Sequence, residues 1–436
     1  MIGDIVIPFN GQQGMYYIKD GKKHVICFNE EATRKFLGDN DDIMFYDISP
    51  IYYQGGIKVY IEEMKLKGIT PIEYGRMACE TIMQKYEPEK LPPYYDGEGL
   101  FCYNQGLFLS GVNRIYQRTR EQKLFDYVKV WVDSHVDEDG KIISESENGW
   151  CSLEHIDFRQ PGVLMYPLYE ETKDERYLMV VKHLVESLKD YPTNSKGGFW
   201  HGYIRPNQML LDGLYMAGPV TVMYADKYQK PEFFDMVARQ VILMYENMKD
   251  EKTGLLVQGW DETGVAEWAS QENGKSQEVW GRGMGWYVAA LADILDYIPV
   301  ENQKRQKLIA IEKELLETLV KYQDKSGRWA EVIDTENREG NWLENSGSCL
   351  ITYALAKAVK KGYLDAEYYE YARKGYEGVI GSLYYDEEGR LQIGDVCTGT
   401  SIDGACYEYY ISRKKAVNDL HGSGAFVLMC SEFEYK

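Results

Sequence analysis

Trp280-Gly281-Arg282-Gly283-Met284-Gly285-Trp286 leads directly into an apolar stretch, residues 287–295. The glycines let the backbone come close to a ligand. An indole face stacks on a sugar ring, and the guanidinium of Arg282 offers a carboxylate two parallel donors. The run therefore predicts either a site for an acidic sugar or a tight loop that opens a buried helix.

Helical periodicity extends from about residue 72 to the end of the chain. Segments 207–226 and 283–297 are apolar nearly all round, which indicates burial on both sides, whereas 231–249 and 302–323 carry a charged outer face. This alternation, at about 40–60 residues per helix pair, predicts an all-α, (α/α)6 barrel whose six inner helices surround a pit; a helical solenoid is the alternative. The expected helices are 72–87, 102–118, 122–136, 160–172, 174–190, 207–226, 231–249, 283–297, 302–323, 346–361, 364–380 and 419–434.

The beginning of the chain has a different pattern. Asp20-Gly21 lies between two β-type runs and is a good hairpin signal, and Gly55-Gly56 is a weaker one. We therefore expect a small β-containing extension over residues 1–70 and the barrel over residues 71–436.

Composition excludes several classes of partner. Acidic residues outnumber basic ones by 69 to 49, the net charge is -20 and no Lys/Arg-rich run stands out, so neither nucleic acid nor an anionic membrane is expected. The eight Cys and six His show no metal-binding spacing, and no phosphate-binding glycine loop follows a strand, so we expect no metal and no organic cofactor. Neither a signal peptide nor a membrane span is visible, which predicts a cytoplasmic protein. A monomer or homodimer is expected.

Asp212 is the first candidate for chemistry, because it stands in an apolar helical run shortly after Trp200-His201. Burial of a carboxylate costs several kcal/mol unless the group is paired or protonated. A desolvated carboxyl has a raised pKa, as a general acid at neutral pH requires. The alternative is a buried Asp that caps a neighbouring loop.

Two further stretches place ionisable groups near helix starts. Glu154 and Asp157 precede a helix whose first turn holds Pro161; either residue caps this helix or supplies a second carboxylate near Asp212. His421 stands among glycines near the C-terminus, where it either closes over the pit or lies in the first turn of a terminal helix without a chemical role.

Longer motifs carry a family resemblance. The three are Phe199-Trp200-His201 with Leu211-Asp212-Gly213-Leu214-Tyr215-Met216, Trp280-Gly281-Arg282-Gly283 with Gly285-Trp286, and 341–348 with 353–357. From about residue 72 onward the chain resembles the unsaturated rhamnogalacturonyl hydrolases of glycoside hydrolase family 105, which are related to the unsaturated glucuronyl hydrolases of family 88. Residues 1–70 lie outside the resemblance.

The resemblance implies an (α/α)6 barrel that acts on a 4,5-unsaturated uronic acid left by a polysaccharide lyase. In this family an Asp protonates C4 of the vinyl ether, water adds at C5, and the hemiketal opens. Asp212 matches that acid, and Asp157 matches the second carboxylate, with Glu154 as the fallback. The other matched positions imply substrate binding: His201, Arg282, Trp280, Trp286, Gly283, Gln258, Tyr103, Gly106, Trp200 and His421.

Two departures from the family affect substrate recognition. Gln258 stands where the family commonly has His, and Met284 where it has Asn, so carboxylate or hydroxyl recognition there is expected to differ. The favoured substrate, a small acidic oligosaccharide, is unsaturated galacturonyl-rhamnose, with unsaturated glucuronyl-galactose as the alternative. A conventional inverting glycosidase on saturated uronides, which Asp157 and Asp212 would serve, and a sugar-binding barrel without catalysis stay open.

Overall fold

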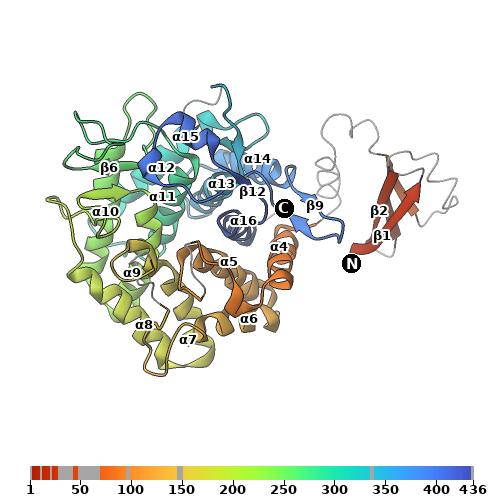
Figure 1. Cartoon of the computed structure of the whole chain (residues 1–436), viewed down its shortest axis with the longest axis horizontal. Helices are drawn as coiled ribbons and strands as arrows, with labels where there is room; N and C mark the ends of the chain where they lie inside the picture. Colours follow the sequence, from red (N-terminus) through yellow and green to blue (C-terminus); the bar gives the residue numbers. More distant parts are fainter. Residues whose placement is uncertain are drawn as a thin grey trace.

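The computed structural model describes residues 2–9, 12–19, 22–27, 43–47, 69–94, 99–144, 151–333 and 338–433. Thirteen α-helices lie within these ranges, and the strands that accompany them after residue 69 are only two or three residues long. Figure 1 shows the helices as a closed double ring seen almost end-on. The fold is the predicted all-α, (α/α)6 barrel.

The inner ring consists of six helical elements, each packed on the next, with the last closing on the first. Helix α11 shows why they lie inside, because every one of its residues is buried, as its apolar sequence predicts. Contacts between first-turn residues, such as Tyr103 with His421, bring the helix starts to one end of the barrel, here called the amino end. The elements are α5 (Tyr103–Thr119), η2 (Ile156–Leu164) continued by α7 (Met165–Thr172), α9 (Asp212–Tyr228), α11 (Gly281–Ile294), α13 (Asn345–Lys360) and α16 (Leu420–Glu432).

The outer ring is amphipathic and covers the inner one. Its helices begin with the expected signals: Thr70 and Glu73 form a capping box, and Pro231 occupies a first helical turn. The outer helices are α4 (Pro71–Lys85), α6 (Gln122–Asp133), α8 (Glu175–Glu186), α10 (Pro231–Met248), α12 (Arg305–Leu319) and α14 (Tyr369–Ile380).

One predicted boundary was wrong in a way that matters. The helix expected from residue 207 begins only at Asp212, because β5 (Gln208–Leu210) pairs with β6 (Gly259–Asp261). Asn207 has a φ of 63°, a left-handed conformation that no helix interior accepts. Asp212 is therefore the first residue of α9 and not an interior one.

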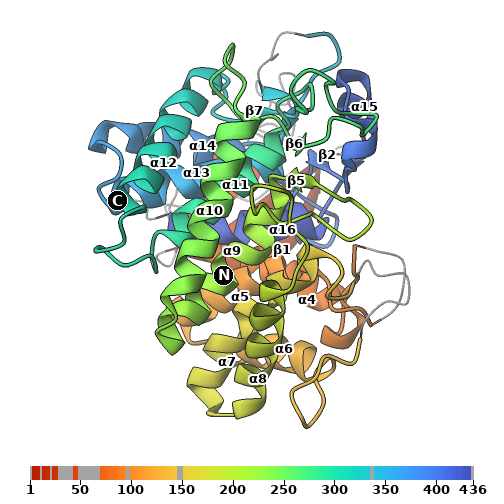
Figure 2. The same ribbon diagram turned by 90° about the vertical axis from the view of Figure 1, so that its left-hand side faces the viewer.

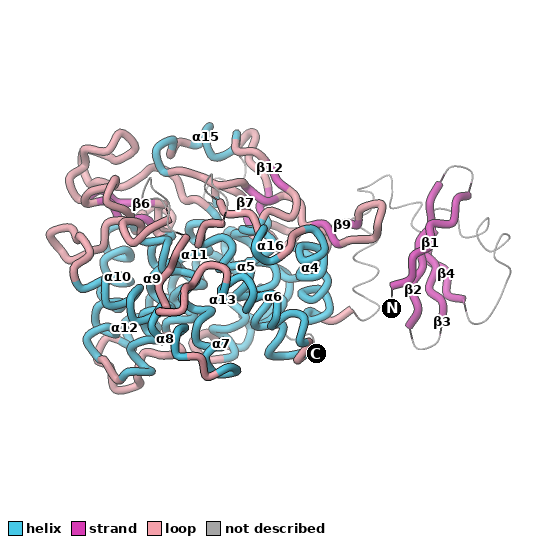
Figure 3. Tube along the Cα trace, turned by 60° about the horizontal axis from the view of Figure 1, so that its bottom comes forward, coloured by secondary structure: helices cyan, strands magenta, loops and turns pink. Residues whose placement is uncertain are grey.

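The connection between α14 and α16 is the longest excursion from the barrel. It carries β9 (Tyr384–Tyr385), β10 (Leu391–Gln392), β11 (Val396–Cys397), α15 (Tyr407–Ser412) and β12 (Lys415–Ala416), and α15 was not predicted. Figure 2 places α15 beside β5, β6 and β7 (Trp329–Ala330). Figure 3 shows the loops and short strands gathered at one end of the helices. This end carries the candidate site.

A small sheet precedes the barrel in sequence. Strands β1 (Ile2–Phe9), β2 (Gln12–Lys19) and β3 (Lys22–Cys27) pair antiparallel, and β4 (Ile43–Asp47) pairs parallel with β3. The β2–β3 pairing agrees with the hairpin signal at Asp20-Gly21, whereas Gly55-Gly56 lies outside the described residues. The division of the chain at residue 70 stays a prediction. Among the described residues, no helix is both long and apolar enough to cross a membrane.

Candidate active site

Asp212 presents a carboxyl group at the start of α9. Its Oδ2 is buried and has no hydrogen-bond partner among the described residues. Burial raises the pKa of Asp212 to about 6, although its backbone hydrogen bond and the positive charge of Arg282 act in the opposite direction. The group therefore changes its protonation state near neutral pH, as the sequence analysis expected of an acid catalyst.

Asp157 lies between two buried imidazoles. Its carboxylate oxygens are 3.4 Å from Nδ1 of His155 and 3.5 Å from Nε2 of His201. A bridge between residues 155 and 202 fixes the two segments. Burial lowers the pKa of His155 to about 3 and that of His201 well below its ordinary value. Both rings are therefore neutral near Asp157.

The same three side chains also have the spacing of a metal site. Their ligand atoms all lie within 4.8 Å of one another. No other group of His, Cys, Asp or Glu in the described part of the chain has this spacing. Two neutral imidazoles and a carboxylate suit several divalent metals. Nδ1 of His155 accepts the backbone N–H of Asp157 at 3.4 Å, so the group is also held together without an ion, and the expectation that no metal is needed stays a prediction.

Arg282, in the first turn of α11, is fully buried and held by backbone carbonyls. Its Nη1 donates to Cys397 O at 2.5 Å and its Nη2 donates to Thr398 O at 2.9 Å. Its Nε has no hydrogen-bond partner among the described residues. An arginine stays charged even when buried, so a fixed cation with an unused donor lies near Asp212.

Trp280 is the N-cap residue of α11 and is 1 % exposed. The guanidinium carbon of Arg282 lies 4.8 Å from the centroid of its ring. The indole N–H donates to Glu331 Oε1 at 3.1 Å. Burial, with the nearby Glu344, raises the pKa of Glu331 to about 8. Glu331 is therefore largely neutral at pH 7 and does little to offset the charge of Arg282.

Tyr103 and His421 meet where the first and last inner helices close the ring. The Tyr103 hydroxyl lies 2.7 Å from His421 Nε2, and His421 Nδ1 lies 2.6 Å from Asp419 Oδ1. Tyr94 packs edge-on against both rings, at 5.7 Å and 5.3 Å between centroids. The predicted residues Tyr103 and His421 are thus brought together, and Tyr94 joins them.

Gln258 contacts the excursion that carries α15. Its Oε1 accepts a hydrogen bond from Tyr410, whose ring stacks on Trp280 with 6.3 Å between centroids. The charge of Asp212 is among the influences that raise the pKa of Tyr410, after burial and Glu331. Tyr410 therefore belongs to the surroundings of Asp212.

The remaining predicted positions lie at the edges of this cluster. A Cβ on Gly106 would lie 2.1 Å from Gln160 Oε1, so Gly106 allows α5 to pack closely on η2. A Cβ on Gly283 would lie 3.0 Å from the Trp280 ring. Trp286 is 1 % exposed, one turn deeper than Arg282, and its ring lies 4.7 Å from Tyr215. All three positions serve close packing beside the cluster.

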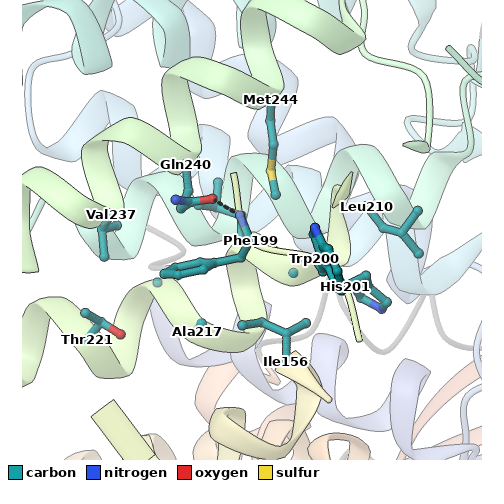
Figure 4. Close-up of a pocket in the computed structure, with 13 residues that line it drawn as sticks. Ile156, Phe199, Trp200, His201, Leu210, Ala217, Thr221, Val237, Gln240 and Met244 are labelled. Atoms are coloured by element: carbon teal, nitrogen blue, oxygen red, sulfur yellow. Dashed lines mark hydrogen bonds between the residues drawn. The ribbon is translucent and has the colours of Figure 1, made fainter. Parts of the chain in front are cut away.

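Trp200 and His201 also line a separate, mainly apolar cavity. Figure 4 shows it between α9, α10 and the loop before β5, with Phe199 and Met244 among its walls. The backbone N–H of Phe199 donates to Gln240 at 2.9 Å and so fixes this loop. The cavity offers few partners for sugar hydroxyls, so the candidate polar groups are those around Asp157 and Asp212.

Sequence reasoning did not assign roles to Glu331, Tyr410, Asp419 or Tyr94. Tyr410 and Gln258 are 152 residues apart in the sequence, so no local sequence pattern predicts their contact. The role of Asp419 as the N-cap of α16 could have been predicted, because Asp is a preferred N-cap residue and it precedes His421 by two positions.

The fold and this cluster define an (α/α)6-barrel enzyme site with an isolated buried acid and a fixed cation. The profile described as Glycosyl Hydrolase Family 88 matches residues 74–435, and the chain belongs to this family. It is a glycoside hydrolase of the unsaturated uronyl type.

Individual relatives agree with this assignment. The chain is 27% identical over 303 residues to the unsaturated rhamnogalacturonyl hydrolase YesR of Bacillus subtilis, covering 68% of this chain and 79% of that protein. A family 105 glycoside hydrolase structure from C. acetobutylicum is 32% identical, with a TM-score of 0.76 over 82% of this chain and 98% of the other. The unsaturated glucuronyl hydrolase of Bacillus sp. GL1, at 12% identity and a TM-score of 0.62 over 83% and 95% of the two chains, shares the fold.

Proposed function

We propose that this hydrolase removes a 4,5-unsaturated uronic acid from lyase-generated disaccharides by hydrating the C4=C5 vinyl ether, with Asp212 as acid and then base. The observation that carries the proposal is the carboxyl of Asp212, which is buried, lacks a partner at Oδ2 and has a pKa of about 6. An acid with this pKa is partly protonated at neutral pH and gives up its proton readily.

The reaction then needs no other acid. Asp212 transfers its proton to C4, and the π electrons form the new C–H bond, which leaves positive charge at C5 and the ring oxygen. Water adds at C5 and returns one proton to the Asp212 carboxylate. The resulting hemiketal opens to an open-chain keto acid, whose C1 is now a hemiacetal that expels the leaving sugar. One water is consumed, and Asp212 ends protonated, ready for the next cycle.

Arg282 supports recognition of the uronate. Its Nη atoms are engaged by the carbonyls of residues 397 and 398, and its Nε is buried, so Arg282 acts on the substrate through its charge. The charge cannot be lost by deprotonation, and the helix starts at the amino end add partial positive charge. A carboxylate on C5 therefore has a favourable partner close to Asp212.

Asp157 is proposed to bind a sugar hydroxyl or orient the attacking water. The two neutral imidazoles of His155 and His201 face its oxygens at 3.4 and 3.5 Å and fix the direction of the carboxylate.

The leaving sugar is proposed to be rhamnose, in unsaturated galacturonyl-rhamnose. Two relatives are named for rhamnose-containing substrates: YesR, and the unsaturated 3S-rhamnoglycuronyl hydrolase of Formosa agariphila, which is 30% identical over 185 residues. Unsaturated glucuronyl-galactose is the alternative. The two substrates share one unsaturated ring, since elimination at C4 removes the difference between the parent acids, so Asp212 and Arg282 serve either.

The test follows the near-ultraviolet absorbance of the conjugated C=C–carboxylate group in both disaccharides. We expect the signal to decay with wild type and to persist with Asp212→Asn. Asp226→Asn, an exposed Asp near the end of the same helix, is the matched control and should behave as wild type. Equal decay with Asp212→Asn would refute the proposed acid. Release of sugar from saturated uronides without any decay would show a conventional inverting glycosidase.

A further inference from the structure

A second cavity, of about 260 Å³, lies inside the barrel and opens at the end opposite Asp212. Gln117 in the last turn of α5 and Asp296 just beyond α11 are exposed and lie at its mouth. Two inner helices line it with residues three or four positions apart, a spacing that places side chains on one face of a helix. They are Ser110, Asn113 and Gln117 of α5, and Tyr215, Pro219 and Met223 of α9.

Three amide side chains of this cavity lack hydrogen-bond partners. Asn113 is 8 % exposed and Gln160 of η2 is 2 % exposed. Neither side chain, nor that of Gln117 at the mouth, makes a hydrogen bond to another described residue. Buried amides are normally paired, because an unpaired one loses the hydrogen bonds that it makes in water. Their gathering around one cavity indicates a polar ligand with several hydrogen-bonding groups.

The charged groups at the cavity are already paired with one another. Asp293 contacts Arg114 at 3.2 Å and the ammonium group of Lys357 at 2.5 Å. Asp296 contacts Lys357 at 2.6 Å and Lys361 at 2.7 Å. Neither carboxylate is left free for a cation, and the carbonyl ends of α5 and α11 add partial negative charge that opposes an anion. The cavity therefore favours a neutral ligand.

We propose that this cavity is a second binding site of the hydrolase, which takes a neutral monosaccharide. The amides of Asn113, Gln117 and Gln160 both donate and accept, and so pair with sugar hydroxyls, which do the same. Pro167 and Pro219 supply apolar surface for the C–H faces of the ring. A single water needs only about 15 Å³, so the cavity is large enough for a bigger ligand.

The site goes beyond the proposed function and does not depend on it. The neutral leaving sugar of the proposed reaction belongs to the class of ligand that the cavity favours, whereas the uronate does not. The two ends of the barrel thus differ in sign: helix starts and Arg282 favour a carboxylate beside Asp212, and helix ends disfavour one at the second cavity. This difference separates binding at one end from binding at the other.

The experiment follows the methyl resonances of methionine in the labelled full chain during titration with rhamnose, galactose or galacturonate. Met223 lines the second cavity, whereas Met284 lies in the first turn of α11 and reports on the candidate active site. We expect both neutral sugars to shift the Met223 resonance, with dissociation constants in the millimolar range. Galacturonate should leave the Met223 resonance unchanged.

Variants of the amides test which groups hold the sugar. Asn113→Leu exchanges an unpaired amide for an apolar side chain of similar size, so it should keep the fold and weaken rhamnose binding by about 10-fold. Gln117→Leu, at the exposed mouth, leaves the core intact and should weaken binding by about 3-fold. Asn247→Leu, an amide of the outer helix α10 that donates to the carbonyl of residue 243, is the matched control and should bind as wild type.

The outcomes separate this proposal from the proposed function. Asp212→Asn should keep the Met223 shift, and Asn113→Leu should keep the wild-type kcat/KM on the unsaturated disaccharides. A Met223 resonance that no neutral sugar shifts would overturn the second site, and so would wild-type binding by both Asn113→Leu and Gln117→Leu or an equal response to galacturonate. A wild type that shows the Met223 shift but never hydrates the unsaturated ring would refute only the proposed function.

Discussion

Asp212 and Asp293 are two aspartates of neighbouring inner helices with opposite electrostatic settings. Asp212 begins α9, and burial raises its pKa to about 6. Asp293 lies near the end of α11, and Lys357 at 2.5 Å with Arg114 at 3.2 Å overcomes the effect of burial and holds its pKa at about 2. Tyr353 also donates to it.

The difference shows that the number of hydrogen-bonding and charged partners, and not burial alone, decides whether the pKa of a buried carboxylate is raised or lowered. Asp293 is surrounded by donors and is ionised at every working pH, so it can bind the barrel together but cannot exchange a proton. Asp212 lacks a partner at Oδ2 and is left between its two protonation states. We therefore expect the amino end of the barrel to carry the chemistry and the Asp293 cluster to tie the helices together.

The largest effect should come from removing the unpartnered acid. Asp212→Asn should lower kcat on the unsaturated disaccharides by about 1,000-fold or more, because an amide cannot protonate C4. In wild type, kcat/KM should fall as the pH rises through about 6, since the reacting form is the protonated one. Steady-state rates from pH 4.5 to 8.5 measure both. A rate that rises through this range would mean that Asp212 acts first as a base.

The same Asp→Asn substitution at Asp293 should affect the stability of the fold and not the activity. Asp293→Asn leaves the buried ammonium of Lys357 with less compensation and should lower the free energy of unfolding by about 3 kcal/mol. Urea denaturation measures the loss, and kcat should stay within a few-fold of wild type. Asp235→Asn, which breaks an exposed ion pair with Lys304, is the control and should change stability little. A loss below about 1 kcal/mol would remove the contrast with Asp212.

Substitution of Asp212, the proposed acid, should stabilise the fold near neutral pH. The pKa of Asp212 is higher in the folded chain than in the unfolded chain, so the folded state binds more protons between about pH 4 and 6, and wild-type stability falls as the pH rises through this window. Asp212→Asn escapes this loss and should gain about 2 kcal/mol on wild type between pH 4 and 7. Thermal or urea unfolding at both pH values tests the sign. A variant that loses stability as the pH rises relative to wild type would show that Asp212 is paired in the folded protein.

Local sequence patterns predicted the barrel but only part of the site. The apolar run of α11 and the acid at Asp212 were readable because burial and periodicity are local properties. The true start of α9 was not, since β5 pairs with a strand about fifty residues later. The Tyr103–His421 contact spans 318 residues, so the two side chains were separate candidates until the ring closed.

The smallest effect is expected at an ion pair that joins two rim loops and has one exposed partner. Arg205 contacts Asp403 through two hydrogen bonds, at 2.7 and 2.6 Å, but the Asp403 side chain is 64% exposed. Water competes for such a carboxylate, so Asp403→Asn should cost about 0.5 kcal/mol, and about 1 M salt should largely remove the difference. Urea denaturation at low and high salt measures it. If the free energy of unfolding fell by more than about 2 kcal/mol and salt did not remove the difference, this ion pair would stabilise the fold as the buried contacts of Asp293 do.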